Sequence, residues 1–235
     1  MLRKVIAACF LLFTFFAHSQ QACSTLGQNP ATAFPVCGLD TFRQSSVPNC
    51  GGKNIPTPSC ADALYQDLNP FWYKFTCYQT GTLGFLIIPD DQGDDYDWQL
   101  FDITGRDPNA VYTDPSLIVA ANWSAIYGNT GASSAGTSLV NCAGFTYPNF
   151  SSMPVVQQGH NYILLLSHFN TFKPGEAGYG LSFGGGTGSI VDPLKPVLVS
   201  ASANCSGESI FVALNKKLQC STLAADGSDF ILVPK

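Results

Sequence analysis

The chain has 235 residues, a formal net charge of −5, 46% hydrophobic residues and only 11% charged residues. This hydrophobic content is enough to form a core, which argues against a disordered chain. The basic residues show no cluster beyond Lys216 and Lys217, whereas nucleic-acid affinity depends on neutralising phosphates. The composition therefore predicts a folded, mildly acidic protein with no nucleic-acid partner.

The first residues have the pattern of a secretory signal peptide. Arg3 and Lys4 give a positive start, residues 5–16 are almost wholly apolar, and residues 17–19 include small side chains where cleavage would fall. An apolar run of about a dozen residues is too short to cross a bilayer, which takes roughly 20. We expect residues 1–19 to be removed, leaving a secreted or cell-surface protein that does not insert into the membrane.

Eight of the nine cysteines follow the predicted signal peptide. In an exported chain an even number predicts disulfides, and no pair has the C-x-x-C spacing that would favour a zinc site. Proximity along the chain suggests the bridges Cys77–Cys142 and Cys205–Cys220, although sequence does not fix connectivity. The remaining four cysteines would then bridge among themselves, namely Cys23, Cys37, Cys50 and Cys60.

The N-terminal part of the mature chain is predicted to be irregular. Residues 20–60 combine four cysteines with many Pro, Gly, Asn and Ser residues, which predicts a cross-linked segment with little regular structure. The best helical candidate in the chain follows at Ser59–Asp67, where Ser59 could cap a short turn.

Strands dominate the part between residues 61 and 191, which we expect to form one domain. Short apolar or aromatic runs bounded by turn residues are typical of a β-sandwich. Residues 104–158 are expected to form a long loop region. The predicted strands are 70–79, 81–89, 98–103, 162–168 and 179–183.

The sequence Asp192-Pro-Leu-Lys-Pro196 predicts a rigid linker, because each Pro fixes φ and biases the preceding residue toward extended geometry. Three more strands are expected after it, at 197–203, 209–214 and 229–234. About forty residues are too few for an independent sandwich. We therefore interpret residues 197–235 as the start of a second, Ig-like module that continues further.

The densest charge in the sequence is a run of carboxylates between two predicted strands. Oxygen-rich groups of this kind suit Ca²⁺, which takes about six to eight oxygen ligands. The twelve-residue spacing of an EF-hand is absent, and a solvated acidic turn is the alternative. The candidate calcium ligands are Asp90, Asp91, Asp94, Asp95 and Asp97.

Aromatic side chains offer a second candidate site. Trp72 and Trp98 lie in predicted strands and are expected in the core. Trp123, Tyr127 and Tyr147 lie in the predicted loop region, where rings with polar groups could stack on a sugar. They are the candidate ligand-binding residues.

The strand DYDWQLFD, followed by Thr104-Gly105, resembles the D-x-D-hydrophobic-x-L-hydrophobic-D strand of bacterial pre-peptidase C-terminal domains. Those domains are small secreted β-sandwiches attached to larger exported proteins. The segments GHNYILLLSHFN and GEAGYGLSF are similar to the closing strands of that pattern, so the resemblance covers about residues 70–185.

The combination of NPFWYKFTC, DYDWQLFDITG and FGGGTGSI is also similar to N-terminal regions of large Bacteroidota surface proteins. Such proteins are typically exported by the type IX system and end in a gliding-motility-associated C-terminal sorting domain. That resemblance implies a surface role. No sorting domain is present in these residues, which fits a truncated chain and leaves the secretion route open.

These patterns predict an all-β protein, a disulfide-stapled antiparallel β-sandwich of jelly-roll or pre-peptidase C-terminal-like type followed by a partial Ig-like module. Enzyme signatures are poor, because Glu176 and Glu208 are the only glutamates, and His160 and His168 occupy a turn and a strand end. We expect no catalytic residues.

We therefore expect a non-catalytic adhesion or structural binding module of a larger cell-surface or secreted protein. Ca²⁺ would stabilise it if the acidic loop binds the ion, and its partner would be an extracellular polysaccharide or protein. The alternative is an accessory, carbohydrate-binding domain of a secreted hydrolase.

Overall fold

The computed structural model describes residues 22–38, 40–57, 60, 65–169, 177–206 and 208–216. The predicted signal peptide and the predicted strand 229–234 lie outside these residues. The chain divides into two compact units, Met1–Val191 and Asp192–Lys235. The division falls at the start of the expected linker.

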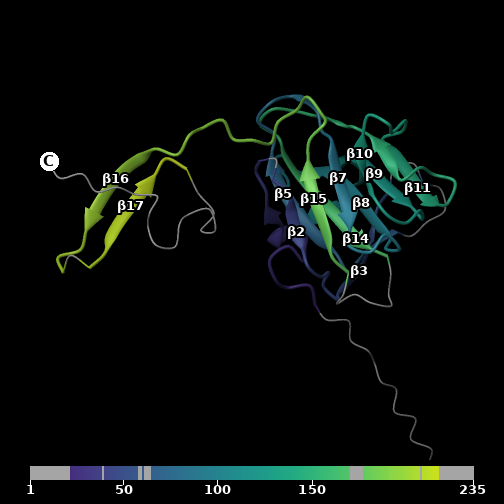
Figure 1. Cartoon of the computed structure of the whole chain (residues 1–235), viewed down its shortest axis with the longest axis horizontal. Coiled ribbons are helices and arrows are strands. Elements are labelled where there is room, and N and C mark those ends of the chain that lie inside the picture. The colour runs from purple at the N-terminus through teal and green to yellow at the C-terminus, as the bar shows by residue number, and fades with distance from the viewer. Residues whose placement is uncertain are drawn as a thin grey trace, which may run out of the picture. The chain divides into compact units, whose positions relative to one another are not determined.

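The larger unit contains a six-stranded sheet (Figure 1). Its central pairs are antiparallel, whereas both edge pairs, β1 with β5 and β11 with β9, are parallel. In spatial order the strands are β1 (Phe34–Pro35), β5 (Phe71–Thr76), β14 (Asn161–His168), β8 (Tyr96–Asp102), β9 (Ile118–Ser124) and β11 (Val140–Gly144).

A five-stranded sheet faces it. The β12–β10 pair is parallel and the other pairs are antiparallel. In spatial order the strands are β12 (Phe150–Ser152), β10 (Thr130–Ser133), β7 (Phe85–Pro89), β15 (Tyr179–Phe183) and β2 (Phe42–Gln44).

Smaller elements complete this unit. Two short antiparallel pairs join β3 (Gly51–Ile55) to β4 (Tyr65–Leu68) and β6 (Gly81–Thr82) to β13 (Val155–Val156). The 3₁₀ turns are η1 (Pro30–Thr32), η2 (Pro108–Tyr112) and η3 (Pro115–Leu117), and each begins with a proline after an Asn or Asp cap.

The main core lies between the two large sheets. Side chains alternate along a strand, so Tyr96 and Trp98 of β8 point toward the opposite sheet. Trp98 meets Phe85 edge to face with ring centroids 4.7 Å apart, and Tyr96 meets Tyr179 at 5.1 Å. The hydroxyls of Tyr73 and Tyr179 are hydrogen-bonded at 2.8 Å. The buried Trp98 confirms the expectation for that residue.

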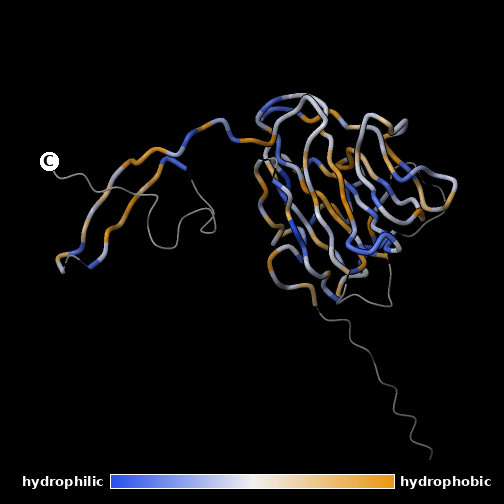
Figure 2. Tube along the Cα trace, in the orientation of Figure 1, coloured by the Kyte–Doolittle hydropathy of each residue, from blue (hydrophilic) through white to orange (hydrophobic). Residues whose placement is uncertain are grey.

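A second core covers the other face of the six-stranded sheet. Trp72 is fully buried there, as expected, and its ring lies 6.2 Å from that of Phe101 and 5.8 Å from that of Tyr112 in η2. The sheet is therefore covered on both faces. Figure 2 shows the resulting hydrophobic stretches along the strands of this unit.

The all-β class is confirmed, and three local expectations are wrong. Tyr65–Leu68 is strand β4, so the end of the helical candidate Ser59–Asp67 is extended. Residues 104–158 contain β9 to β13 rather than long loops. The segment 20–60, expected to have little regular structure, contains β1, β2 and β3, and β1 and β2 pair with the two large sheets.

The described residues contain two disulfides, Cys23–Cys50 and Cys60–Cys142. The predicted Cys77–Cys142 bridge is wrong, because Cys77 is fully buried in the main core and carries a free thiol. Cys37 is an exposed free cysteine, so it does not join the predicted N-terminal set. Cys205 is also exposed and free, and its predicted partner Cys220 lies outside the described residues.

The smaller unit contributes an antiparallel pair, β16 (Leu198–Ala203) and β17 (Ile210–Leu214). Several of its apolar side chains are exposed, including Val199 and Phe211. In the described ranges no helix has the length and apolar character of a membrane span.

The Cys60–Cys142 bridge should contribute strongly to stability, because its cysteines are 82 residues apart. Cys142→Ser should lower the free energy of unfolding by about 2–5 kcal/mol in denaturant titrations. Cys37→Ser is the matched control and should have no effect, since Cys37 is exposed and unbridged. Peptide mapping without reductant should recover Cys60 linked to Cys142, and recovery of a Cys77–Cys142 peptide would contradict this structure.

Candidate functional site

A small cavity opens at the end of strand β8, on the face of the sheet opposite the main core. Asp97 lies within β8 and Asp95 immediately precedes it, two positions apart and so on the same face of the chain. Because Tyr96 and Trp98 enter the main core, both carboxylates are directed to the other side. Both residues are buried there.

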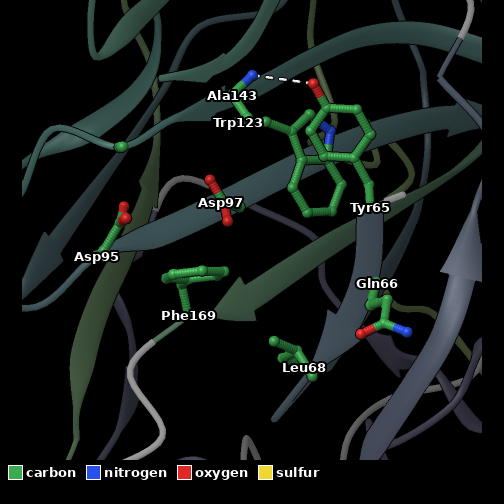
Figure 3. Close-up of a pocket in the computed structure, with 9 residues that line it drawn as sticks. Tyr65, Gln66, Leu68, Asp95, Asp97, Trp123, Ala143 and Phe169 are labelled. Atoms are coloured by element: carbon green, nitrogen blue, oxygen red, sulfur yellow. Dashed lines mark hydrogen bonds between the residues drawn. The ribbon is translucent and has the colours of Figure 1, made fainter. Parts of the chain in front are cut away.

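Two aromatic rings form one wall (Figure 3). Tyr65 of β4 and Trp123 of β9 are buried, with ring centroids 4.6 Å apart and planes tilted by 45°. The Trp123 indole Nε1–H donates to Gln99 Oε1 at 2.9 Å, and the backbone N–H of Ala143 donates to Tyr65 Oη at 2.9 Å. Both rings are therefore held in place by buried polar contacts.

The Cys60–Cys142 bridge lies beside this wall. Cys142 belongs to β11 and precedes Ala143, whose N–H holds the Tyr65 hydroxyl. The covalent link therefore ties the segment before Tyr65 to the strand that positions its hydroxyl.

Phe169 lies on another side of the cavity, as Figure 3 shows. Its backbone N–H donates to the carbonyl of Asp95 at 3.0 Å. Two residues earlier, in β14, Ser167 Oγ accepts from the N–H of Leu68 at 3.0 Å and donates to the Leu68 carbonyl at 2.9 Å. Ser167 thus fastens the end of β4 to β14.

The cavity has a volume of about 150 Å³. Its walls are mainly aromatic and aliphatic, and its ionisable carboxylates are the two aspartates. The lining residues that matter for its chemistry are Asp95, Asp97, Tyr65, Trp123, Leu68 and Phe169.

The two carboxylates are costly to ionise. Burial raises the pKa of Asp95 to about 7. Burial, together with the nearby charge of Asp95, raises the pKa of Asp97 well above its ordinary value. Within the described part of the chain, no basic side chain forms an ion pair with either residue, and Asp95 Oδ1 is buried without a hydrogen-bond partner.

Burial also raises the pKa of the Tyr65 hydroxyl, and the charge of Asp97 adds to that effect. The apolar walls of the cavity therefore make a negative charge on either carboxyl group costly. A bound cation would balance it.

The five aspartates proposed as calcium ligands are divided among separate contacts. Asp90 forms a salt bridge of 2.9 Å with Arg43, and Asp91 Oδ1 accepts from the N–H of Gly93 at 2.8 Å. Asp94 Oδ1 lies 3.2 Å from Nε2 of the buried His168. Only Asp95 and Asp97 share the cavity.

Among the described residues, no group of three or more His, Cys, Asp or Glu side chains is arranged to hold a metal ion. Calcium binding by the acidic segment stays a prediction.

The three aromatic candidates also separate. Trp123 belongs to β9 and is buried in the second core, so the expectation that it lies on a loop is wrong. Tyr127 and Tyr147 are exposed to 57% and 37%. Tyr127 meets Phe145 edge to face, with ring centroids 6.4 Å apart. Tyr127 and Phe145 therefore form an exposed pair of rings, whereas the predicted member Trp123 is buried.

Sequence reasoning missed Tyr65 and Phe169 as parts of the site. Tyr65 lies in the segment assigned to a helix, and Phe169 follows the last residue of β14. Neither has a local pattern that points to the aspartates, because the segments meet only in the folded sheet. The alternation in Asp95-Tyr96-Asp97-Trp98 was the one available signal.

Comparisons with protein-family models, with curated proteins and with solved structures find no match.

The buried aspartates should make stability depend on pH. An Asp whose pKa is raised on folding holds its proton more tightly in the folded chain, and this proton binding stabilises the folded state. The stabilisation is fully present below about pH 4 and is lost as the pH rises through the pKa of the folded state. For Asp95 that value is about 7. We expect the melting temperature to fall between about pH 5 and about pH 8.

Asp95→Asn should reduce that fall and melt about 2–4 °C above the wild type near pH 8. The control is Asp91→Asn, which removes an exposed carboxylate and should keep the wild-type slope. Thermal melts followed by circular dichroism across this range test the prediction. Equal slopes for Asp95→Asn and the wild type would show that Asp95 is already ionised at little cost.

Proposed function

We propose that this protein is a non-catalytic extracellular binding module and that the cavity around Asp95 and Asp97 is its ligand site. The observation that carries the proposal is the pairing of two buried carboxylates, lacking a counter-charge among the described residues, with ordered aromatic walls. Leaving such groups buried and unpaired costs stability. A site that retains this cost is suited to a ligand that relieves it.

The geometry supports binding better than hydrolysis. Both carboxylates project from one stretch of strand and approach a ligand from the same side. Glycoside hydrolysis needs two carboxylates that flank the scissile bond. The walls of the cavity are held by Gln99, Ala143 and Ser167, which suits recognition by a rigid surface.

The extracellular location of the module is proposed from the sequence. Two disulfides fit an oxidising compartment. The signal-like N-terminus and the resemblance to type IX-exported surface proteins support the proposal that this module belongs to a larger cell-surface or secreted protein with an adhesive or structural role. Its partner would be an extracellular polysaccharide or protein.

Adhesion should depend on the cavity. Beads coated with the protein should be retained on surfaces carrying extracellular polysaccharide or protein, and the double variant Asp95→Asn/Asp97→Asn should reduce retention on the preferred surface at least about tenfold. The measurement is the fraction of beads retained under flow. The same preparation should show no turnover of peptide, ester or glycan substrates.

The matched control is Asp91→Asn/Asp107→Asn. It removes the same charge from two exposed positions, and Asn can still accept the backbone N–H that each Asp accepts. Retention should stay at the wild-type level in this variant. Equal loss in both double variants would mean that net charge, rather than the cavity, causes adhesion.

A carbohydrate-binding accessory role is the second candidate. The supporting observation is the exposed ring pair of Tyr127 and Phe145, which are exposed to 57% and 71%. Exposed aromatic rings stack on the apolar faces of sugars. This surface would serve a hydrolase that carries the module.

Affinity electrophoresis in gels containing soluble polysaccharides tests this role. If the ring pair binds sugar, Tyr127→Ala/Phe145→Ala should abolish the retardation of the wild type, with an affinity loss of about tenfold or more. Val155→Ala, which removes a separate exposed apolar side chain, should migrate as the wild type does. Retardation that survives loss of both rings would reject this surface.

A further inference from the structure

The Asp95–Asp97 cavity carries one inference beyond a general binding role: the chemical class of its ligand. Asp95 is only 5% exposed, and its Oδ1 atom has no hydrogen-bond partner. A buried carboxylate oxygen without a donor is costly, and ionised groups in such places need a charged partner that also donates hydrogen bonds. A cation with N–H or O–H donors would supply both the hydrogen bond and the opposite charge that an ionised Asp95 lacks.

The walls favour an organic cation over a metal ion. Ca²⁺ takes about six to eight oxygen ligands, whereas this cavity is enclosed chiefly by Tyr65, Trp123 and Phe169. Aromatic faces attract organic cations through the ring quadrupole, most strongly where water is excluded. Among the described residues no third His, Cys, Asp or Glu joins the two aspartates in an arrangement for a metal.

Hydrogen-bonding capacity narrows the cation further. A quaternary ammonium has no N–H to offer the free oxygen of Asp95, whereas a primary ammonium has three. The cavity, at about 150 Å³, matches in size an engineered protein cavity of roughly 150 Å³ that holds benzene. That space suits a short alkyl chain with a terminal ammonium.

We propose that the cavity binds the primary ammonium end of an alkyl chain, the group carried by a lysine side chain or a free alkylamine. Asp95 and Asp97 accept its N–H bonds. Tyr65 and Trp123 line one side of its methylene groups and Phe169 lines another. The inference rests on the proposed function, because it names the ligand class of that same site. The protein's net charge of −5 assists the approach of such a cation.

The test uses the whole protein, labelled with ¹⁵N, and follows the Trp123 indole resonance, assigned with Trp123→Phe. The probes are pentylammonium and Nα-acetyl-lysine amide. Nα-acetyl-norleucine amide is the control without the ammonium. At about pH 8 an ammonium probe should shift this resonance, and the norleucine amide should not. Asp97→Asn should weaken the response at least about tenfold, and Asp91→Asn should leave it unchanged.

The two ammonium probes distinguish the sources. A response to the lysine amide supports a protein partner, and a response to pentylammonium alone supports a free amine. An equal shift by the norleucine amide would overturn the proposal in favour of an apolar pocket. An Asp97-dependent shift by Ca²⁺ that neither amine competes with would overturn it in favour of a metal. Failure of both amines with cavity-dependent bead adhesion intact would reject the ammonium and leave the binding role standing.

Discussion

The edge-to-face contact between Phe85 and Trp98 joins the two sheets at the centre of the main core. Because Trp98 is fully buried there, the two-residue alternation of β8 fixes the direction of every neighbouring side chain. Asp95 and Asp97 are turned to the opposite face, where Tyr65 and Trp123 already form a second core. The candidate site is thus a consequence of how one tryptophan packs. A one-residue shift in this strand would exchange the aspartates with the core aromatics.

Much of the sandwich could be predicted from local sequence. The run around Leu164 is continuous and apolar, and around Leu181 large apolar side chains alternate with Gly180 and Ser182. Both are strands as expected, β14 and β15. The strand expected at 98–103 is β8, although it begins two residues earlier, at Tyr96. These segments can be predicted from the sequence because burial of their own side chains determines their structure.

The strands between residues 104 and 158 were not predicted from apolar patterns, because hydrogen bonds between buried polar groups join several of them. Asn122 Nδ2 donates to Ser151 Oγ at 3.2 Å, and Asn141 Nδ2 donates to the same oxygen at 3.1 Å. Ser151 Oγ in turn donates to the carbonyl of Ala121 at 2.8 Å. Buried amides and hydroxyls that satisfy one another leave no apolar period around Asn141 and Ser151, although Ile118 to Ala121 in β9 is an apolar run. For the same reason Tyr65 was missed, since its role depends on Ala143 in a distant strand.

The burial of Cys77 in the main core bears on how the chain reaches its oxidised state. Cys77 lies nearer to Cys142 in sequence than Cys60 does, so a disordered chain would bring the wrong pair together at least as often. Burial withdraws the Cys77 sulfur from solvent and raises the pKa of its thiol, which lowers the supply of reactive thiolate. Collapse of the sandwich before oxidation therefore favours pairing of Cys142 with Cys60 over pairing with Cys77. Conformational folding protects the correct covalent pairing, and an oxidant that acts ahead of collapse would trap a non-native chain.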